Sequence, residues 1–183
     1  MTAPSAPGGG PAARAKAEPV VYRGMALIVP DTDSEWHGYF EAARAGRLVV
    51  RRCEECGRLR YPPGAGCPWC ASLTWIWTPV SGRGTIHSYE LVVQAIQPGF
   101  REWAPYPVVV VELDEQRGQP TPDDGVRLVS NLVTAEFQPE REEHVAIGAR
   151  VVVCFQPIGP DAVLPQFRLT GEPSVTPLWR FPG

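Results

Sequence analysis

The hydrophobic positions of this chain follow a helical period around residue 40 and a strand period over most of the chain after it. Within residues 31–47 the large apolar side chains recur at the intervals i, i+3, i+4 and i+7, which is one stripe along a helix. These side chains are Trp36, Tyr39, Phe40 and Ala43. Thr32 and Glu35 have the spacing of a capping box, and Gly46 is a natural helix stop. The pattern predicts an N-terminal helix within residues 31–47.

After the helix, short runs of apolar and β-branched residues alternate with turn-rich segments, a pattern typical of strands. Residues 48–52 form the first run. The other five are residues 83–95, 107–113, 126–133, 150–155 and 164–169. Residues 138–147, between the third and fourth of these five, could hold a short helix or a turn. Five strands interrupted once in this way fit a small Greek-key barrel of the OB type better than a seven-stranded sandwich.

Two closely spaced pairs of cysteines carry the clearest chemistry in the chain. They are Cys53-Glu-Glu-Cys56 and Cys67-Pro-Trp-Cys70. Two such pairs can converge into one tetrahedral thiolate cage, which suits zinc, and four cysteine ligands leave no open position for a catalytic water. Gly57 after the first pair suits a tight turn, whereas the second pair has Ala71 there. We therefore predict structural zinc, with iron in a rubredoxin-like site or two disulfides as the alternatives.

Charge adds little to this interpretation. The chain has 183 residues, of which 44% are apolar, and a net charge of −3, so it has no general attraction to nucleic acid or anionic membranes. Six arginines nevertheless lie between residues 44 and 60, around the first cysteine pair. A zinc ion held by four thiolates has a net charge of about −2, which neighbouring arginines could offset. A patch that faces phosphate groups is the alternative.

Residues 1–30 are predicted to be a disordered leader, because Ala, Pro and Gly dominate Met1–Pro19. This leader has no apolar run long enough for a signal peptide or a membrane span. Without an export signal, paired thiolates predict a reducing, cytoplasmic compartment and no membrane. Cys154 is predicted to be a buried core thiol. The fold class is thus mostly β, with the helix at 31–47, a zinc ribbon at 48–78, an OB-fold barrel at 79–171 and a tail at 172–183.

Aromatic and arginine side chains, which are enriched at interface hot spots, mark two candidate contact surfaces. The first lies on the helix and ribbon and comprises Trp36, Tyr39, Phe40, Trp69 and Trp75. The second is the loop 97–106, with Phe100, Arg101 and Trp103. Either surface could instead pack within the protein, the stripe on the ribbon and barrel and the loop around its own aromatic cluster. The three histidines stand in no catalytic motif, so we do not expect independent catalysis.

Taken together, the motifs resemble a known family, in which a rubredoxin-like zinc ribbon precedes an OB-fold and which is associated with acyl-CoA metabolism. The resemblance extends from Trp36 to Leu169. It rests on Arg52-Cys-Glu-Glu-Cys-Gly57, Cys67-Pro-Trp-Cys70, Ser81-Gly-Arg-Gly84, Pro105-Tyr-Pro at the start of a strand, and Ile147-Gly-Ala-Arg150. The cysteine spacing alone occurs in many zinc ribbons, and the glycine and proline motifs that follow make the resemblance specific.

The resemblance implies a partner subunit rather than a free enzyme. Members are found with thiolase-like enzymes, and one group acts with a lipid-transfer-protein-type thiolase homologue as an aldolase in steroid side-chain degradation. It therefore implies a non-catalytic, zinc-binding subunit of a hetero-oligomer, with acyl-CoA near the interface. Two other functions stay open: a nucleic-acid-binding protein, which the net charge argues against, and a standalone acyl-CoA carrier.

Overall fold

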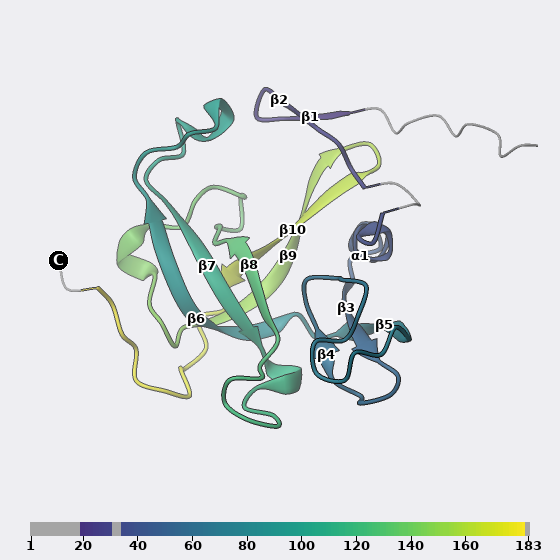
Figure 1. Ribbon diagram of the computed structural model, residues 1–183. Helices are drawn as coiled ribbons and strands as arrows, with labels where there is room; N and C mark the ends of the chain where they lie inside the picture. The colour runs from purple at the N-terminus through teal and green to yellow at the C-terminus, as the bar shows by residue number, and fades with distance from the viewer. Residues whose placement is uncertain (1–18, 31–33, 182–183) are drawn as a thin grey trace, which may run out of the picture.

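The computed structural model describes residues 19–30 and 34–181, which form a mostly β protein with one short α-helix. Figure 1 shows an N-terminal hairpin, a small ribbon sheet and a larger sheet. The strands are β1 (Val20–Tyr22), β2 (Met25–Leu27), β3 (Leu48–Cys53), β4 (Leu59–Arg60), β5 (Trp75–Val80), β6 (Arg83–Val92), β7 (Tyr106–Leu113), β8 (Arg127–Asn131), β9 (Arg150–Gly159) and β10 (Ala162–Leu169). The helix α1 spans His37–Arg44, and 3₁₀ turns lie at Pro98–Phe100, Asp114–Gln116 and Glu142–His144. No helix in these described residues is both long and apolar enough to cross a membrane.

The hairpin of β1 and β2 corrects one prediction. Its two-residue turn, Arg23 and Gly24, has positive φ at both positions (+52° and +73°), which makes a type I′ turn suited to tight hairpins. Tyr22 is buried, and its hydroxyl donates a hydrogen bond to Oε1 of Gln156 in β9 over 3.2 Å. The prediction of disorder for residues 1–30 is therefore wrong for residues 20–27, because a distant strand holds them. Residues 1–18 lie outside the described part of the chain.

The helix α1 is shorter than the predicted helix at 31–47. The predicted capping box includes Thr32, which lies outside the described residues. The N-cap residue of α1 is Trp36, and its side chain makes no capping hydrogen bond. The helix packs directly on the ribbon. A Cβ at Gly38 would lie 2.1 Å from Nε1 of Trp77 in β5, so only glycine permits this close approach.

The end of α1 follows the predicted stop. Gly46 has a φ of +67° and donates its N–H to the carbonyl of Ala43 over 2.9 Å, while Arg47 donates to the carbonyl of Ala42 over the same distance. This pair of hydrogen bonds is the Schellman closure, which requires the left-handed conformation that glycine adopts without strain. The chain turns there into β3, the central strand of the ribbon sheet, whose order is β4-β3-β5.

The larger sheet contains the five predicted strands in the order β10-β9-β6-β7-β8, all paired antiparallel. This is the strand order of an OB-fold, and the predicted interruption between the third and fourth strands contains the 3₁₀ turn at Glu142–His144. The two edge strands approach each other at one isolated parallel bridge, between Leu132 and Phe167. The described residues show no continuous ladder there, so the structure supports a five-stranded OB-fold sheet.

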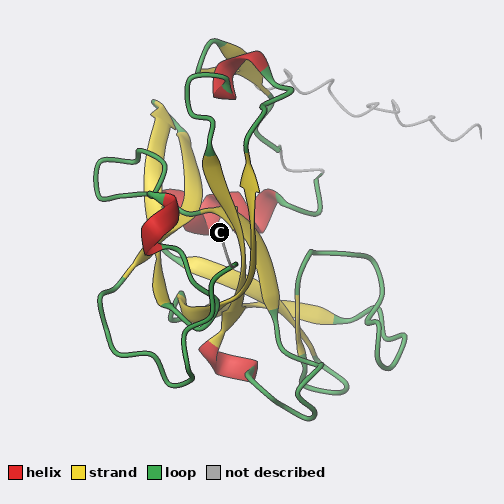
Figure 2. Ribbon diagram, turned by 90° about the vertical axis from the view of Figure 1, so that its left-hand side faces the viewer, coloured by secondary structure: helices red, strands yellow, loops and turns green. Residues whose placement is uncertain are grey.

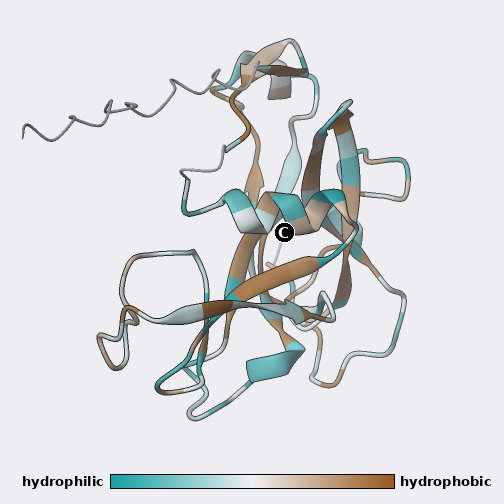
Figure 3. Cartoon of the chain, turned by 90° about the vertical axis from the view of Figure 1, so that its right-hand side faces the viewer, coloured by the Kyte–Doolittle hydropathy of each residue, from teal (hydrophilic) through white to brown (hydrophobic). Residues whose placement is uncertain are grey.

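One hydrophobic core joins the ribbon, the helix and the larger sheet. Alternate residues of β7 are buried, as expected for a strand with one face toward a core. Val50 of the ribbon and Tyr39 of α1 belong to the same buried cluster as Ile86, Val111 and Phe167 of the larger sheet. Figure 3 shows hydrophobic residues concentrated on the strands behind α1, with both kinds of residue along the helix itself. The zinc ribbon is therefore not an independent module.

The C-terminal tail folds back on the larger sheet. Trp179 and Ile147 exchange two backbone hydrogen bonds of 2.8 and 3.0 Å. The Phe181 ring packs edge-on against Tyr89, whose hydroxyl accepts the Phe181 N–H. The sequence left open whether the tail folds back or binds something else. The described residues up to Phe181 fold back, although Trp179 and Phe181 stay about half exposed.

Candidate metal centre

The four predicted cysteine ligands meet at one point at the end of β3. Their sulfurs all lie within 4.8 Å of one another, with 3.6 Å between Cys53 and Cys70 and 3.6 Å between Cys56 and Cys67. A tetrahedral zinc ion with Zn–S bonds of about 2.3 Å requires sulfur separations of about 3.8 Å. All four are free thiols, so the disulfide alternative is wrong. The sulfurs fit one tetrahedral ion.

Backbone hydrogen bonds shape both cysteine pairs into the same turn. In the first pair the N–H of Cys53 donates to the carbonyl of Arg58 over 3.0 Å, and in the second the N–H of Cys67 donates to Ser72 over 2.8 Å. Each bond spans five residues and closes a knuckle around its two sulfurs. The short sequence between the two cysteines of each pair therefore positions two ligands without help from distant residues.

The thiols differ in how readily they ionise. The pKa of Cys53 is lowered to about 6, chiefly because the backbone N–H of Cys56 donates to its sulfur. Burial acts to raise the pKa of Cys67, but backbone N–H groups of its knuckle and the side chains of Cys56 and Cys70 together lower it. The pKa of Cys70 is raised to about 12, because burial and the other cysteines outweigh the N–H of Ser72, which favours the thiolate. A divalent cation offsets the repulsion between neighbouring thiolates, so the four cysteines lose their protons as the metal ion binds.

The arginines around the metal centre divide between interior and surface. Arg51 and Arg60 are only 3% and 4% exposed, whereas Arg52, which follows Arg51 in β3, is exposed. The Arg51 guanidinium lies 3.7 Å from the ring centroid of Trp75, and its burial lowers its pKa. The arginines therefore do not form one continuous phosphate-facing patch.

The aromatic stripe of α1 lies at a groove of about 550 Å³ between the helix, β8 and β10. Tyr39 is buried at 7% exposure, and Trp36 packs edge-on against it and against Tyr61 at 5.5–5.6 Å. Phe40 and Trp36 are partly buried and line the groove. The stripe thus packs within the protein on one side and leaves an accessible edge on the other.

Residues from distant segments complete this groove. Ile28 and Val129 lie on its wall at 82% and 65% exposure. Two amide side chains also line it: Asn131 donates a hydrogen bond of 3.2 Å to Gln166, which is 1% exposed. None of these four residues belongs to a sequence motif, so the sequence did not predict the groove. The groove exists only because the fold places α1 beside β8 and β10.

The second predicted surface, the loop 97–106, has its own aromatic cluster. Trp103 is 5% exposed and packs edge-on against Phe100 at 5.5 Å. The Arg23 guanidinium, from the hairpin turn, lies 3.9 Å from the Trp103 ring centroid, and Figure 2 shows the hairpin beside the 3₁₀ turn of this loop. Trp103 therefore supports the loop from within, whereas Arg101 is exposed. The remaining candidate, Trp69, donates its indole N–H to Asp124 over 2.9 Å.

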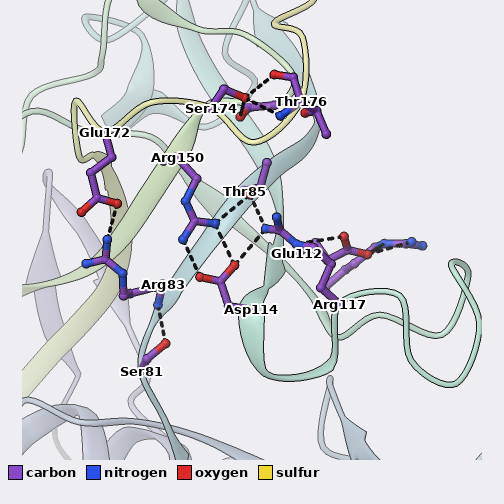
Figure 4. Close-up of polar contacts among 12 residues, drawn as sticks. Ser81, Arg83, Thr85, Glu112, Asp114, Arg117, Arg150, Glu172, Ser174 and Thr176 are labelled. Carbon is purple, nitrogen blue, oxygen red and sulfur yellow. Dashed lines mark hydrogen bonds and ion pairs between the residues drawn. The ribbon is translucent and has the colours of Figure 1, made fainter.

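A network of ion pairs joins β6, β7 and β9, as Figure 4 shows. Arg150 donates to Asp114 over 2.7 Å and to the hydroxyl of Thr85 over 2.9 Å. The pKa of Asp114 is lowered chiefly because Arg150 donates to its carboxylate. Arg83 pairs with Glu172 and so attaches the tail to the sheet. Because each of these carboxylates has an arginine partner, we interpret the network as structural.

Two family descriptions match this chain. Residues 40–75 match the ChsH2 rubredoxin-like zinc ribbon domain, and residues 77–156 match the ChsH2 C-terminal OB-fold domain. Together with the sulfur geometry, the first match identifies the metal centre as a structural zinc site.

Related proteins and one solved structure agree with these matches. The chain is 39% identical to a "Probable enoyl-CoA hydratase alpha subunit" of Thermomonospora curvata over 71% of its length, although it spans only 36% of that protein. It is 30% identical to DUF35 domain-containing scaffold proteins of Methanocaldococcus jannaschii and Methanothermobacter thermautotrophicus, covering 62% and 64% of this chain and 71% and 80% of theirs. A solved structure described as "Ltp2-ChsH2(DUF35) aldolase" has 35% identity and a TM-score of 0.61, covering 77% of this chain and 98% of that one. The chain therefore belongs to the ChsH2 (DUF35) family of proteins with a zinc ribbon and an OB-fold.

Proposed function

We propose that this protein is a zinc-stabilised auxiliary subunit of a thiolase-like enzyme that cleaves a β-hydroxyacyl-CoA, with a steroid side chain as the acyl group. The observation that carries the proposal is the match to the chain in the Ltp2-ChsH2(DUF35) aldolase, which is covered over 98% of its length. The enoyl-CoA hydratase subunit among the relatives also supports an acyl-CoA substrate.

We assign the reaction chemistry to the partner subunit. In a retro-aldol cleavage the β-hydroxyl group loses a proton and becomes a carbonyl, the Cα–Cβ bond breaks, and the α-carbon of the thioester gains a proton. Proton transfer of this kind needs a base that is free to accept. Asp114 is held by Arg150, and Glu140 contacts His144 at 2.8 Å, so neither of these two carboxylates is a free base. The zinc has four protein ligands, so it leaves no coordination position for substrate.

The contribution of this chain is then a rigid surface. The zinc stabilises a ribbon that is too small to fold alone, and the shared core fixes the ribbon and α1 against the larger sheet. We propose that the edges of Trp36 and Phe40 and the wall of the 550 Å³ groove contact the partner and the acyl-CoA between them. The apolar wall suits an acyl chain, and Asn131, which donates to the buried Gln166, offers its amide to the amide-containing arm of CoA. Phe100 and Arg101 form a second proposed contact, supported by Trp103.

Co-expression with a thiolase-like protein tests this proposal. We expect the two chains to co-purify in gel filtration and the complex to cleave a β-hydroxyacyl-CoA, while this chain alone shows no turnover. If the isolated chain cleaves the thioester as fast as the complex does, the auxiliary role is wrong. If the two chains migrate separately at micromolar concentration, the proposed partnership is wrong.

The groove also supports a second candidate function, a standalone acyl-CoA carrier. This function requires tight binding without a partner. Titration of the isolated zinc-loaded chain with CoA and with an acyl-CoA in a calorimeter separates the two candidates. Heat of binding in the micromolar range favours the carrier, and its absence rejects it.

A further inference from the structure

Two buried arginines hold the loop between the two cysteine pairs. Arg51 of β3 and Arg60 of β4 are cross-strand partners. Both donate to the carbonyl oxygen of Gly64, over 2.7 and 2.8 Å, and Arg60 also donates to the carbonyl of Gly66. Two guanidinium groups thus share one neutral acceptor inside the protein, at 3% and 4% exposure.

One edge of Arg60 has no hydrogen-bond partner. Its Nε and Nη2 are both buried and unpaired, and no carboxylate among the described residues forms an ion pair with this side chain. These two nitrogens form the side edge of the planar guanidinium, which can hold two oxygens of a carboxylate or phosphate in parallel. Buried donors are normally paired, and leaving a charged one unpaired is costly.

The charge of the metal centre does not remove this requirement. Zinc with four thiolates has a net charge of about −2, which can balance two buried guanidinium charges. Charge balance does not supply a hydrogen-bond acceptor, however. Among the described residues, the side chains that contact the cysteine sulfurs are those of other cysteines, so neither arginine donates to a thiolate.

Arg60 also lines a cavity of about 360 Å³. The cavity lies between the loop that joins the two cysteine pairs, the second cysteine pair and the larger sheet. Its wall includes Pro62, Pro68, Trp69 and Val126. The carboxylate of Asp124, next to Gly125 on this wall, already accepts hydrogen bonds from Trp69 and from Thr121. A cavity of this size has room for an oxyanion group and for part of the molecule that carries it.

We propose that this cavity is a binding site for an oxyanion, a carboxylate or a phosphate group, held by the Nε and Nη2 edge of Arg60. Both nitrogens are closed to solvent in this conformation, so binding includes a shift of the loop. The Gly64 and Gly66 carbonyls accept from Nη1 of the same guanidinium, so the loop and the anion use different nitrogens of Arg60. Among the lining residues, the site shares Tyr61 with the proposed partner groove, but the proposal does not depend on that groove.

Titration of the zinc-loaded full chain with glutarate, and separately with inorganic phosphate, tests the proposal. The ¹H–¹⁵N resonance of Arg60 Nε is the direct probe in the wild-type protein. We expect this resonance to shift as ligand is added until the site is saturated, with a Kd on the order of 1 mM. This affinity suits a single charge-assisted contact in which two N–H groups of one guanidinium bind one anion. A response to glutarate alone assigns a carboxylate ligand, and a response to phosphate alone assigns a phosphate ligand.

The Arg60→Lys variant separates the two-pronged contact from simple charge. It keeps the positive charge beside the zinc but loses the edge, so we expect binding at least about tenfold weaker with one zinc per chain retained. Arg52→Lys, at the exposed neighbouring position, is the control and should bind as the wild type does. The proposal is overturned if neither probe shifts the Arg60 resonance, or if both variants bind equally well. The wild-type titration decides the question alone if Arg60→Lys does not fold.

Discussion

Gly57 and Ala71 occupy equivalent places in the two cysteine knuckles. Each directly follows the second cysteine of its pair, with a φ of +73° for Gly57 and +60° for Ala71. Each donates its N–H to the carbonyl of the first cysteine, over 3.0 and 2.9 Å. The glycine adopts this left-handed conformation without strain, whereas the Cβ of the alanine makes it costly.

This equivalence predicts opposite effects of two matched substitutions. Ala71→Gly should raise the free energy of unfolding by up to about 1 kcal/mol. The relief of backbone strain in the folded state outweighs the greater conformational entropy of the unfolded chain. Gly57→Ala should lower the free energy of unfolding by about 1 kcal/mol for the converse reason. Urea unfolding of the zinc-loaded proteins measures both. Equal destabilisation by the two variants would contradict the equivalence.

Loss of zinc should destabilise the whole protein and not the ribbon alone. Val50 of the ribbon shares a core with Ile86 of the larger sheet, so unfolding of the ribbon exposes part of that core. We expect Cys56→Ser to lose the metal and to unfold in one transition at a lower temperature. Metal analysis and thermal unfolding followed by circular dichroism measure this. Cys154→Ser, outside the metal centre, is the control and should keep one zinc.

Two results would contradict this prediction. One is iron in the purified protein, which would overturn the assignment of the metal. The other is a separate transition of the larger sheet at an unchanged temperature in Cys56→Ser, which would show that the common core does not couple the two parts.

Asp114 should stabilise the protein in a pH-dependent way. Arg150 lowers the pKa of this carboxyl in the folded state, so its contribution is complete above the ordinary carboxyl pKa and is lost as the pH falls through the lowered value. Asp114→Asn should therefore cost about 1–3 kcal/mol at neutral pH, since Arg150 loses its charged partner. The difference from the wild type should shrink in acid. Urea unfolding across this pH range measures it.

Asp161→Asn provides the control for this ion pair. Asp161 also contacts an arginine, Arg44, over 3.2 Å, but its side chain is 82% exposed. Exposed pairs contribute about 0–1 kcal/mol, so its removal should change little at any pH. If the two variants have the same effect, the network around Asp114 does not stabilise the sheet as its geometry indicates.

The groove beside α1 should matter for the complex and not for folding. Val129 is on its wall and 65% exposed, so Val129→Asp should fold normally but weaken the complex with the thiolase-like partner about tenfold or more. Val175→Asp changes a similarly exposed valine of the tail (70% exposed) and is the matched control. Binding measured by calorimetry compares the two. An unchanged affinity in Val129→Asp would remove the groove from the proposed interface.

Local features of the chain were predictable because a few neighbouring residues suffice to define them. The metal ligands followed from the spacing of Cys53, Cys56, Cys67 and Cys70, since each knuckle is closed by hydrogen bonds within six residues. The helix end followed from Gly46, because only the backbone conformation at that position is involved. The five strands followed from alternation, which depends on the intrinsic period of a strand.

Long-range contacts account for the hairpin, the burial of Trp103 and the groove, which the sequence did not predict. The β1–β2 hairpin lies in a segment that resembled a disordered leader, but Tyr22 is held by Gln156, 134 positions away. Trp103 became a support rather than an exposed contact because Arg23 covers it, and the groove unites Ile28 with Val129. No local propensity encodes such pairs. Burial and hydrogen bonding between distant segments select them, and those interactions exist only once the sheet and its shared core have formed.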